Sequence, residues 1–540
     1  MNRSALARRG RRATAVAGAV AVTTLALLPA GGALTAAAKP PGAKLCDTRA
    51  NVTYQNVLDC VTVQGVLEHE QALQAIANAN GGTRAAGTPG YEASVDYVVG
   101  TLEAAGWHVT IDEFPFVFVP PAQLQQVAPV SAVLQTGVFT GTGYGIVTGA
   151  VTPVDINLTP PREPVNSGCE AGDFAGFPVG NIALIQRGTC EFGVKAINAQ
   201  AAGASAVIIF NQGNTPLREG LITGTLFGIN QQPLTIPVVG ASFADGAALA
   251  QAGSRARIQV DPPENRPQKN VIAELTGDND ANVVMAGAHL DSVQAGPGIN
   301  DNGSGSSALL ELAQTIKKLE PVNTVRLAWW GAEESGLLGS DAYVDELSQA
   351  EKDRIALYLN FDMVASPNYI LMTYDGDESG WNAPAGVAIP DGSVAIEKLF
   401  ERLYTKLGQP YDDAQFSGRS DYQAFIQSDI PAGGLFTGAE VPKTAAQQAV
   451  WGGTAGAQYD PCYHLACDTI ANLSTTALDV NSDVIAAAVL TYAYSTQSVN
   501  GVAGAPVPGK FPLPAPAGPR GLINGDAGGL APDHDHQSAD

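Results

Sequence analysis

Three apolar runs separated by helical segments constrain the fold of this chain more than any other feature. Val283 to His289, Thr324 to Trp330 and Ile355 to Phe361 have strand-like character, and helices are expected over Ser304 to Leu319 and from about Ser340. Strands that are apolar throughout and alternate with helices are typical of a sheet covered on both faces. We therefore predict an α/β fold with a mixed, mostly parallel central sheet flanked by helices.

Polar side chains follow these strands at the point where each one ends. His289 closes the first run, Glu333 and Glu334 follow the second, and Asp362 follows the third. In open α/β sheets, ligand sites gather beyond the carboxyl ends of the strands. Two adjacent acids directly after a very apolar strand are costly unless something cationic compensates them. The sequence therefore predicts the functional site at this edge of the sheet.

Two further residues extend this group, and each lies in a loop. Asp301 stands in a glycine-rich turn before a helix, where taken alone it would be an N-terminal cap. His464 lies in a short loop between Cys462 and Cys467. Of the six histidines in the chain, only His289 and His464 fall in polar, glycine-flanked segments outside the polar tail, which suits metal ligands. Each residue alone has an ordinary structural explanation, but all of them in this order and spacing predict a metal site.

Asp291 is expected to support the first histidine. Residues two apart on an extended segment project to the same side, so Asp291 can lie near His289. A carboxylate bonded to the far ring nitrogen would fix the histidine tautomer and raise its basicity as a ligand.

Length and charge limit the classes of protein to be considered. At 540 residues the chain is too long for one ordinary domain. Removing residues 1–38 deletes five arginines and no acids, which leaves 24 basic against 52 acidic residues, a net charge near −28. That excess argues against nucleic acid or an anionic membrane as a partner, and we interpret it as an aid to solubility outside the cell.

The N-terminus has the pattern of a secretory signal peptide. Five arginines between Arg3 and Arg12 precede an apolar run from Ala13 to Leu28, and Ala36 to Ala38 offers a cleavage site. The alternative is a membrane anchor, for which the run is short and rich in alanine. We expect a secreted, extracellular protein with no membrane association after the signal is removed.

Six cysteines in an exported chain favour disulfide bonds. Fifteen connectivities are possible, and sequence proximity alone favours the local pairs Cys46–Cys60, Cys169–Cys190 and Cys462–Cys467. A cysteine metal site is disfavoured because no C-x-x-C spacing occurs.

Other segments differ from the strand–helix region in their spacing of apolar residues and in their composition. Helical spacing over Gly65 to Ala77 and Tyr91 to Ala105 precedes a strand-like Trp107 to Phe116, and short β-like runs follow from about Pro120 to Pro263. From about Gly501 the chain is rich in Pro, Gly and Ala and is expected to be flexible, and we interpret its Asp533 to His536 run as a solvated polar end.

The stretch from Pro120 to Pro263 resembles the protease-associated (PA) domain. The resemblance rests on Gly168-Cys169, Asp173-Phe174, the run from Asn181 to Phe192, and Ala204 to Asn211. It implies a β-rich inserted module that contacts substrate or gates the active site, and a stabilising insert without such a part is the alternative. The expected organisation is a signal peptide (1–38), the N-terminal part of the α/β domain (39–120), a PA insertion (121–265), the main part of the α/β domain with the predicted metal site (266–500) and a flexible tail (501–540).

The remaining motifs resemble the M28 family of zinc aminopeptidases. The segment from Ala288 to Glu334, the Asn360 to Met363 motif and the Tyr463-His464 loop carry this resemblance. It implies a zinc exopeptidase fold and two Zn²⁺ ions. Carried over by motif, Asp301 bridges the ions, His289 and Asp362 complete one zinc site, and Glu334 and His464 complete the other.

The resemblance also assigns the residues that act on substrate. Glu333 is expected to be the general base and Tyr463 to help hold the oxyanion, while Arg419 and Met363 are expected to contact substrate. Arg419 transfers less directly, because the family often has histidine after the aspartate of Gly418-Arg419-Ser420-Asp421 and Tyr422 stands here. A cis peptide bond after Asp301 is a further expectation.

The resulting prediction is a secreted, monomeric dizinc aminopeptidase. It would remove the N-terminal residue, preferably large and apolar, from peptides or proteins through a metal-bound hydroxide and the glutamate base. One alternative is a carboxypeptidase on the same fold, which would need cationic groups for a terminal carboxylate, and the site segments offer only Arg419. The other is a non-catalytic exported protein that binds peptides, against which the intact Glu333 and five ligands argue.

Overall fold

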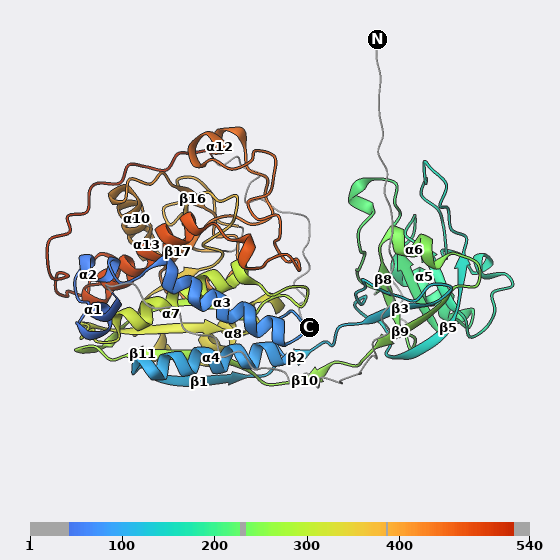
Figure 1. The fold of residues 1–540 in the computed structure, drawn as a ribbon, viewed down its shortest axis with the longest axis horizontal. Helices are drawn as coiled ribbons and strands as arrows, with labels where there is room; N and C mark the ends of the chain where they lie inside the picture. Colours follow the sequence, from blue (N-terminus) through green and yellow to red (C-terminus); the bar gives the residue numbers. More distant parts are fainter. Residues whose placement is uncertain (1–42, 227–233, 385–386, 523–540) are drawn as a thin grey trace, which may run out of the picture.

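An eight-stranded sheet organises the larger lobe of the molecule, and a seven-stranded sheet organises a smaller one (Figure 1). The structure is a computed structural model and describes residues 43–226, 234–384 and 387–522. The signal peptide predicted over residues 1–38 and the Asp533 to His536 run lie outside the described residues.

The eight-stranded sheet is mixed, with its parallel strands at the centre. Its order is β1-β11-β13-β12-β14-β17-β15-β16. Neighbours β13, β12, β14 and β17 run parallel, as do β15 and β16, whereas β1, β11 and β13 pair antiparallel at one edge and β15 pairs antiparallel with β17. The strands are β1 (His108–Phe114), β11 (Gln268–Leu275), β12 (Asn279–His289), β13 (Asn323–Trp330), β14 (Ile355–Phe361), β15 (Met372–Tyr374), β16 (Asp412–Ala414) and β17 (Ala432–Phe436).

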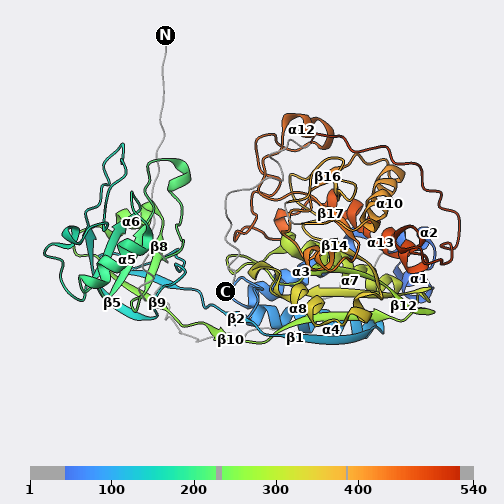
Figure 2. The same ribbon diagram turned by 180° about the vertical axis from the view of Figure 1, so that it is seen from behind.

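Helices cover both faces of this sheet (Figures 1 and 2). Adjacent side chains on β13 point to opposite faces, so Trp329 donates to Ser306 on α7 while Trp330 contacts Tyr343 on α8 and Phe425 on α11. No helix in the described ranges has both the length and the apolar run needed to cross a bilayer. The helices of this lobe are α1 (Ala43–Thr48), α2 (Tyr54–Leu58), α3 (Val63–Ala79), α4 (Pro89–Ala105), α7 (Ser304–Ile316), α8 (Leu338–Glu346), α9 (Gln349–Lys352), α10 (Gly392–Lys406), α11 (Tyr422–Gln427), α12 (Ala445–Trp451), α13 (Thr475–Tyr494) and α14 (Gln497–Asn500).

This architecture confirms the predicted α/β class, and the elements agree closely with the apolar pattern. The strand expected over 355–361 has the same bounds as β14, and the helix expected over 91–105 forms as α4 with two additional residues at its start. Gly106 ends α4 in the left-handed conformation (φ 85°), for which glycine lacks the steric penalty of other residues.

The second lobe contains the region that resembles a PA domain. Its sheet order is β4-β3-β9-β5-β6-β7-β8, with β5 to β8 parallel and the others antiparallel. A two-stranded ribbon of β2 (Val117–Phe118) and β10 (Glu264–Asn265) connects the lobes (Figure 1). The remaining elements are β3 (Gln123–Ala128), β4 (Ala132–Leu134), β5 (Gly145–Val154), β6 (Ile182–Gln186), β7 (Ala206–Phe210), β8 (Val238–Ala241) and β9 (Arg255–Val260), with α5 (Phe192–Ala201) and α6 (Phe243–Leu249).

All three cysteine pairs expected from sequence proximity are present. The structure contains Cys46–Cys60, Cys169–Cys190 and Cys462–Cys467, so every cysteine of the chain is in a disulfide. The third pair closes the short loop that carries His464.

Residues 501–522, the start of the predicted flexible tail, include side chains and carbonyls that contact the larger lobe. The Phe511 ring stacks on Tyr54 at 4.5 Å between centroids, and Arg402 donates to the carbonyls of Leu513 and Pro514. Composition did not reveal this packing because a few widely spaced apolar residues anchor an otherwise proline-rich segment. Proline cannot join a helix interior or a central strand, but it does not prevent an extended segment from lying against a core.

We predict that Phe511→Ala lowers the free energy of unfolding by about 1–3 kcal/mol, because it removes a half-buried aromatic stack. Chemical denaturation measures this, with Lys510→Ala as the matched control because Lys510 is exposed. Equal stability of the two variants would show that the segment contributes nothing to the fold.

Candidate active site

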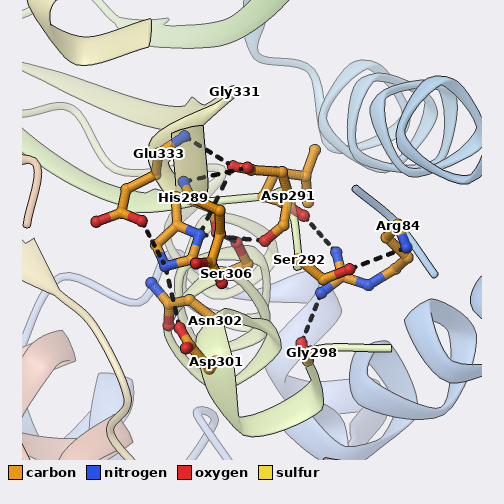
Figure 3. A network of polar contacts seen from close by, with 12 residues as sticks. Arg84, His289, Asp291, Ser292, Gly298, Asp301, Asn302, Ser306, Gly331 and Glu333 are labelled. Carbon is orange, nitrogen blue, oxygen red and sulfur yellow. Dashed lines mark hydrogen bonds and ion pairs between the residues drawn. The ribbon is translucent and has the colours of Figure 1, made fainter. Parts of the chain in front are cut away.

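The parallel strands β12, β13 and β14 bring three of the predicted residues to one edge of the large sheet. His289 is the last residue of β12, Asp362 directly follows β14, and Glu333 begins a tight turn, η4 (Glu333–Ser335), just after β13. Strand register places His289 opposite Trp330, so the carboxyl ends of β12 and β13 lie side by side. Figure 3 shows His289, Asp301 and Glu333 converging from separate segments.

Asp301 lies between the two histidines. Its Oδ1 is 3.2 Å from His289 Nε2 and its Oδ2 is 3.3 Å from His464 Nε2. Asp362 Oδ1 lies 3.3 Å from His289 Nε2, and Glu334 Oε2 lies 2.9 Å from His464 Nε2. One aspartate therefore offers a separate oxygen to each of two histidine–carboxylate pairs.

Glu333 lies slightly outside these pairs. Its Oε2 is 3.9 Å from His289 Nε2, farther than the oxygens of Asp301 and Asp362. Consecutive side chains diverge at η4, so Glu333 faces the His289 side while Glu334 faces His464. The two glutamates therefore have different surroundings.

The donor atoms fit divalent metal ions of the kind bound by histidine and carboxylate. Histidine nitrogens and carboxylate oxygens are the usual non-sulfur ligands of zinc. Glu334 Oε1 and Asp362 Oδ1 are buried and have no hydrogen-bond partner among the described residues, which leaves lone pairs for a cation. Two groups whose ligand atoms lie within 4.8 Å of one another meet here, namely His289, Glu333 and Asp362, and Asp301, Glu334 and His464.

Charge at the site shows why a cation is needed there. Burial and the negative charge of Asp301 raise the pKa of Glu334 to about 7, and burial raises the pKa of Glu333 well above its ordinary value. Burial alone would lower the pKa of His464, but Glu334 and Asp301 raise it to about 11. Both glutamates and His464 therefore favour their protonated forms in the absence of a metal, whereas the two histidines lower the pKa of Asp301.

Asp291 supports the site in a different way from that predicted. His289 Nδ1 donates to the backbone carbonyl of Asp291 at 3.1 Å, whereas the Asp291 carboxylate lies 3.7 Å away. That carboxylate instead accepts from the backbone N–H groups of Glu333 at 3.1 Å and Glu334 at 3.4 Å. The carbonyl still fixes the histidine tautomer, leaving Nε2 to face the carboxylates, while the carboxylate holds the turn that carries both glutamates.

The backbone of Asp301 is held from the opposite side of the site. Asp468 accepts from the N–H groups of Asn300 at 2.9 Å and Asp301 at 3.0 Å. Asn300 also donates its side-chain amide to Asp460 at 2.6 Å. The peptide bond after Asp301 is cis, as the family resemblance implied.

Asp460 and Asp468 also bracket the loop that carries His464. Asp460 accepts from the N–H of Cys462, and Asn472 donates to both aspartates. The two loops that supply Asp301 and His464 are therefore joined through shared hydrogen bonds.

Asp362 is oriented by residues from two other segments. Ser420 donates to Asp362 Oδ2 at 2.6 Å, and Asn360 in turn donates to the Ser420 hydroxyl at 2.8 Å. Asn302, next to Asp301, donates to the carbonyl of Phe361 and accepts from the N–H of Met363. The side chain of Asp362 is thus fixed from outside the site, leaving Oδ1 to face His289.

Arg419 and Tyr463 lie together at the mouth of the site. Arg419 Nη2 donates to the Tyr463 hydroxyl at 3.1 Å, and Nη1 donates to Glu440 Oε1 at 2.8 Å. The rings of Tyr463 and His464 stack at 3.8 Å. The tyrosine hydroxyl is therefore held beside the His464 group by a guanidinium that is itself paired with an acid.

A pocket with apolar walls extends from the acidic group. It is lined by Met363, together with Met372, Trp381, Phe436 and Val441. Trp381 is held by Asp375, whose carboxylate accepts a hydrogen bond from the backbone N–H of Trp381 at 2.7 Å. The pocket therefore combines the acidic group with apolar side chains, and Asp413 and Glu440 also line it.

Several residues of the site were missed in the sequence. Asn300 and Ser420 stand within motifs noted above, but their hydrogen bonds to Asp460 and Asp362 depend on tertiary contacts. Asp468 offers one signal, because it directly follows the cysteine that closes the His464 loop. Trp381 lies in a loop with no pattern that links it to the site.

Comparisons with known proteins agree with this geometry. The family model described as peptidase family M28 matches residues 270–489, and the PA domain model matches residues 147–249. An aminopeptidase from Pseudomonas aeruginosa is 48% identical, covering 82% of this chain and 83% of the relative. A probable leucine aminopeptidase 2 from Aspergillus fumigatus is 46% identical, covering 66% of this chain and 71% of the relative.

Solved structures show the same relationship. A zinc aminopeptidase from Bacillus subtilis matches with a TM-score of 0.56 and 26% sequence identity, covering 79% of this chain and 94% of that chain. Sequence and fold therefore point to the same group of enzymes. The chain is an aminopeptidase that carries a PA domain, and it belongs to peptidase family M28.

Proposed function

We propose that this aminopeptidase uses two zinc ions to remove a large apolar residue from the N-terminus of peptides, and that it acts outside the cell. The observation that carries the proposal is Asp301, which offers one oxygen toward each histidine. His289 and Asp362 would hold one ion, Glu334 and His464 the other, and Asp301 both. The zinc aminopeptidase similar in fold supports the choice of metal.

Bound zinc would supply a Lewis acid and an activated water at neutral pH. Glu333 is placed to take a proton, because it is buried and lies 3.9 Å from His289 Nε2, just beyond the oxygens proposed as ligands. Its raised pKa suits a group that accepts a proton and returns it to the leaving amine. Tyr463, held by Arg419, is placed to donate a hydrogen bond to the oxygen of the substrate carbonyl.

The pocket supports the substrate class. Its acidic end suits a free α-amine, and its walls of Met372, Trp381 and Phe436 suit a large apolar side chain. The relative named leucine aminopeptidase 2 is consistent with this preference.

Carboxypeptidase activity is less well supported than aminopeptidase activity. A terminal carboxylate would need a cation, and Arg419 is the only lysine or arginine among the described residues that line the pocket. Its guanidinium already donates to Glu440 at 2.8 Å. The charge available for a carboxylate is therefore largely compensated.

Export is supported by the N-terminal signal pattern and the disulfides. Three disulfide bonds indicate an oxidising compartment.

We predict that Glu333→Gln lowers kcat for hydrolysis of leucyl chromogenic amides by about 10²–10⁴-fold, because it removes a general base. The variant should retain two zinc ions. Zinc content by elemental analysis and turnover measured on the same sample test this. Gln is close in size to Glu and keeps the backbone bond from Glu333 to Asp291.

A substrate panel provides the control for reaction class. Free aminoacyl amides should be cleaved, N-acetylated forms should resist, and a carboxypeptidase substrate should be inert. Undiminished turnover by Glu333→Gln would remove Glu333 as the base, and cleavage of the acetylated amides would refute exopeptidase action at a free amine.

A second prediction concerns metal and pH. In metal-free protein, Glu334 has a raised pKa of about 7 and His464 of about 11, so the folded state retains protons that the unfolded chain releases. The stability that these two groups contribute is therefore fully present at pH values below the pKa that each group has in the unfolded chain. It falls as the pH rises through the pKa that each group has in the folded protein. Because His464 is partly exposed, we expect a loss of roughly 1–2 kcal/mol between pH 5.5 and pH 8.

Zinc should reverse this trend, because its ligands bind in their deprotonated forms. The rise in melting temperature on adding zinc to chelator-treated protein should be larger at pH 8 than at pH 5.5. A rise that shrinks with pH would show that protons and zinc do not compete at these residues.

A further inference from the structure

Arg84 is a fully buried arginine, and the proposed chemistry does not use it. It lies between α3 and α4 and has no exposed surface. Its Nε donates to the carbonyl of Pro297 at 2.9 Å, Nη2 donates to that of Gly298 at 2.6 Å, and Nη1 donates to that of Leu290. Figure 3 shows this guanidinium beside the Ser292 to Gly298 segment.

These three carbonyls lie at the two ends of one loop. Leu290 directly follows His289, while Pro297 and Gly298 come shortly before Asp301. The loop therefore joins the first proposed ligand to the bridging one, and a single planar group holds both of its ends. The three bonds use all three nitrogens of the guanidinium, which is a rigid fork of donors.

The backbone of Arg84 is held by the same loop. Its N–H donates to the Ser292 hydroxyl at 3.0 Å, and the Ser292 N–H donates to its carbonyl at 3.4 Å. The segment before α4 and the loop after β12 are thus bonded through both main chain and side chain. Movement of Arg84 would displace this loop.

The charge of Arg84 also faces the site. Glu70, Asp291, Asp468 and Asp301 are the acids that interact with it electrostatically. Asp291 and Asp468 are the residues that hold the backbone of Glu333, Glu334 and Asp301. Burying a cation is costly unless it is hydrogen-bonded and compensated by nearby charges. The three carbonyls provide the hydrogen bonds, and the four acids oppose the effect of burial, which lowers the pKa of Arg84.

We propose that Arg84 is a positioning residue of the metal centre. It fixes the loop from Leu290 to Gly298 so that His289 Nε2 and Asp301 Oδ1 stay within reach of one ion. Arg84 touches neither substrate nor metal and acts through the loop. This inference rests on the proposed two-zinc function and adds to it the residue that spaces two of the ligands.

The test measures zinc binding rather than activity alone. Competition with a chromogenic chelator gives the zinc dissociation constants of wild type, Arg84→Lys, Arg84→Ala and the control Arg402→Ala. Arg402 is matched because its guanidinium also donates to two backbone carbonyls, those of Leu513 and Pro514, away from the site. We expect about 10–100-fold weaker zinc binding in both Arg84 variants and no change in the control.

Two further measurements separate positioning from general stability. Added guanidinium ion should restore part of the zinc affinity of Arg84→Ala by occupying the space of the missing group. The melting temperature should fall more in zinc-loaded than in zinc-free Arg84→Lys, because a defect in ligand spacing matters most when zinc is bound. An equal fall in both states would indicate a purely structural role and would overturn the proposal.

The remaining outcomes are also decisive. If Arg84→Ala does not fold, Arg84→Lys decides, because it keeps a buried cation and a donor at the same place. Zinc affinity within about twofold of wild type in a folded Arg84 variant contradicts the inference, since altered outer-shell partners ordinarily cost tenfold or more. If the wild-type protein itself does not bind two zinc ions, the proposed two-zinc function is contradicted, together with the inference about Arg84 that rests on it.

Discussion

The arrangement of Asp301 between two histidines is the constraint on which the rest of the site depends. Its two oxygens lie 3.2 and 3.3 Å from His289 Nε2 and His464 Nε2. These histidines come from a strand end and from a disulfide-closed loop far apart in sequence, so the fold must deliver both to one carboxylate. The Asp301 N–H, which donates to Asp468, and the Arg84 guanidinium, which donates to the preceding loop, help to meet this requirement.

Buried negative charge is the cost of this arrangement, and it explains much of the surrounding structure. Glu333 and Asp362 lie beside His289, and Glu334 lies beside Asp301 and His464. Burial raises the pKa of both glutamates, which shows that the folded chain disfavours their charged forms without a cation. The Glu333 N–H donates to the Asp291 carboxylate and fixes the glutamate turn, while the Ser420 hydroxyl donates to Asp362 and fixes its side chain before any ion arrives. Such outer bonds orient ligands and raise metal affinity.

The sequence predicted the central sheet, and it singled out residues that the structure brings together at one edge of that sheet, because both leave local signals. Apolar strand runs defined β12 to β14, and acids at their ends marked the site. It did not reveal the packing of Phe511 on Tyr54 or the role of Arg84, because both depend on contacts between segments hundreds of residues apart. For Asp291, spacing predicted proximity to His289, but only the fold shows that its carbonyl and not its carboxylate meets the ring.

The most direct test of this account is anomalous diffraction at the zinc absorption edge from crystals of the zinc-loaded protein. A two-zinc centre that shares Asp301 predicts two anomalous peaks roughly 3.5–4 Å apart. One should lie between His289 and Asp362 and the other between Glu334 and His464, both within bonding distance of Asp301. A single peak, or two peaks that do not share Asp301, would contradict it.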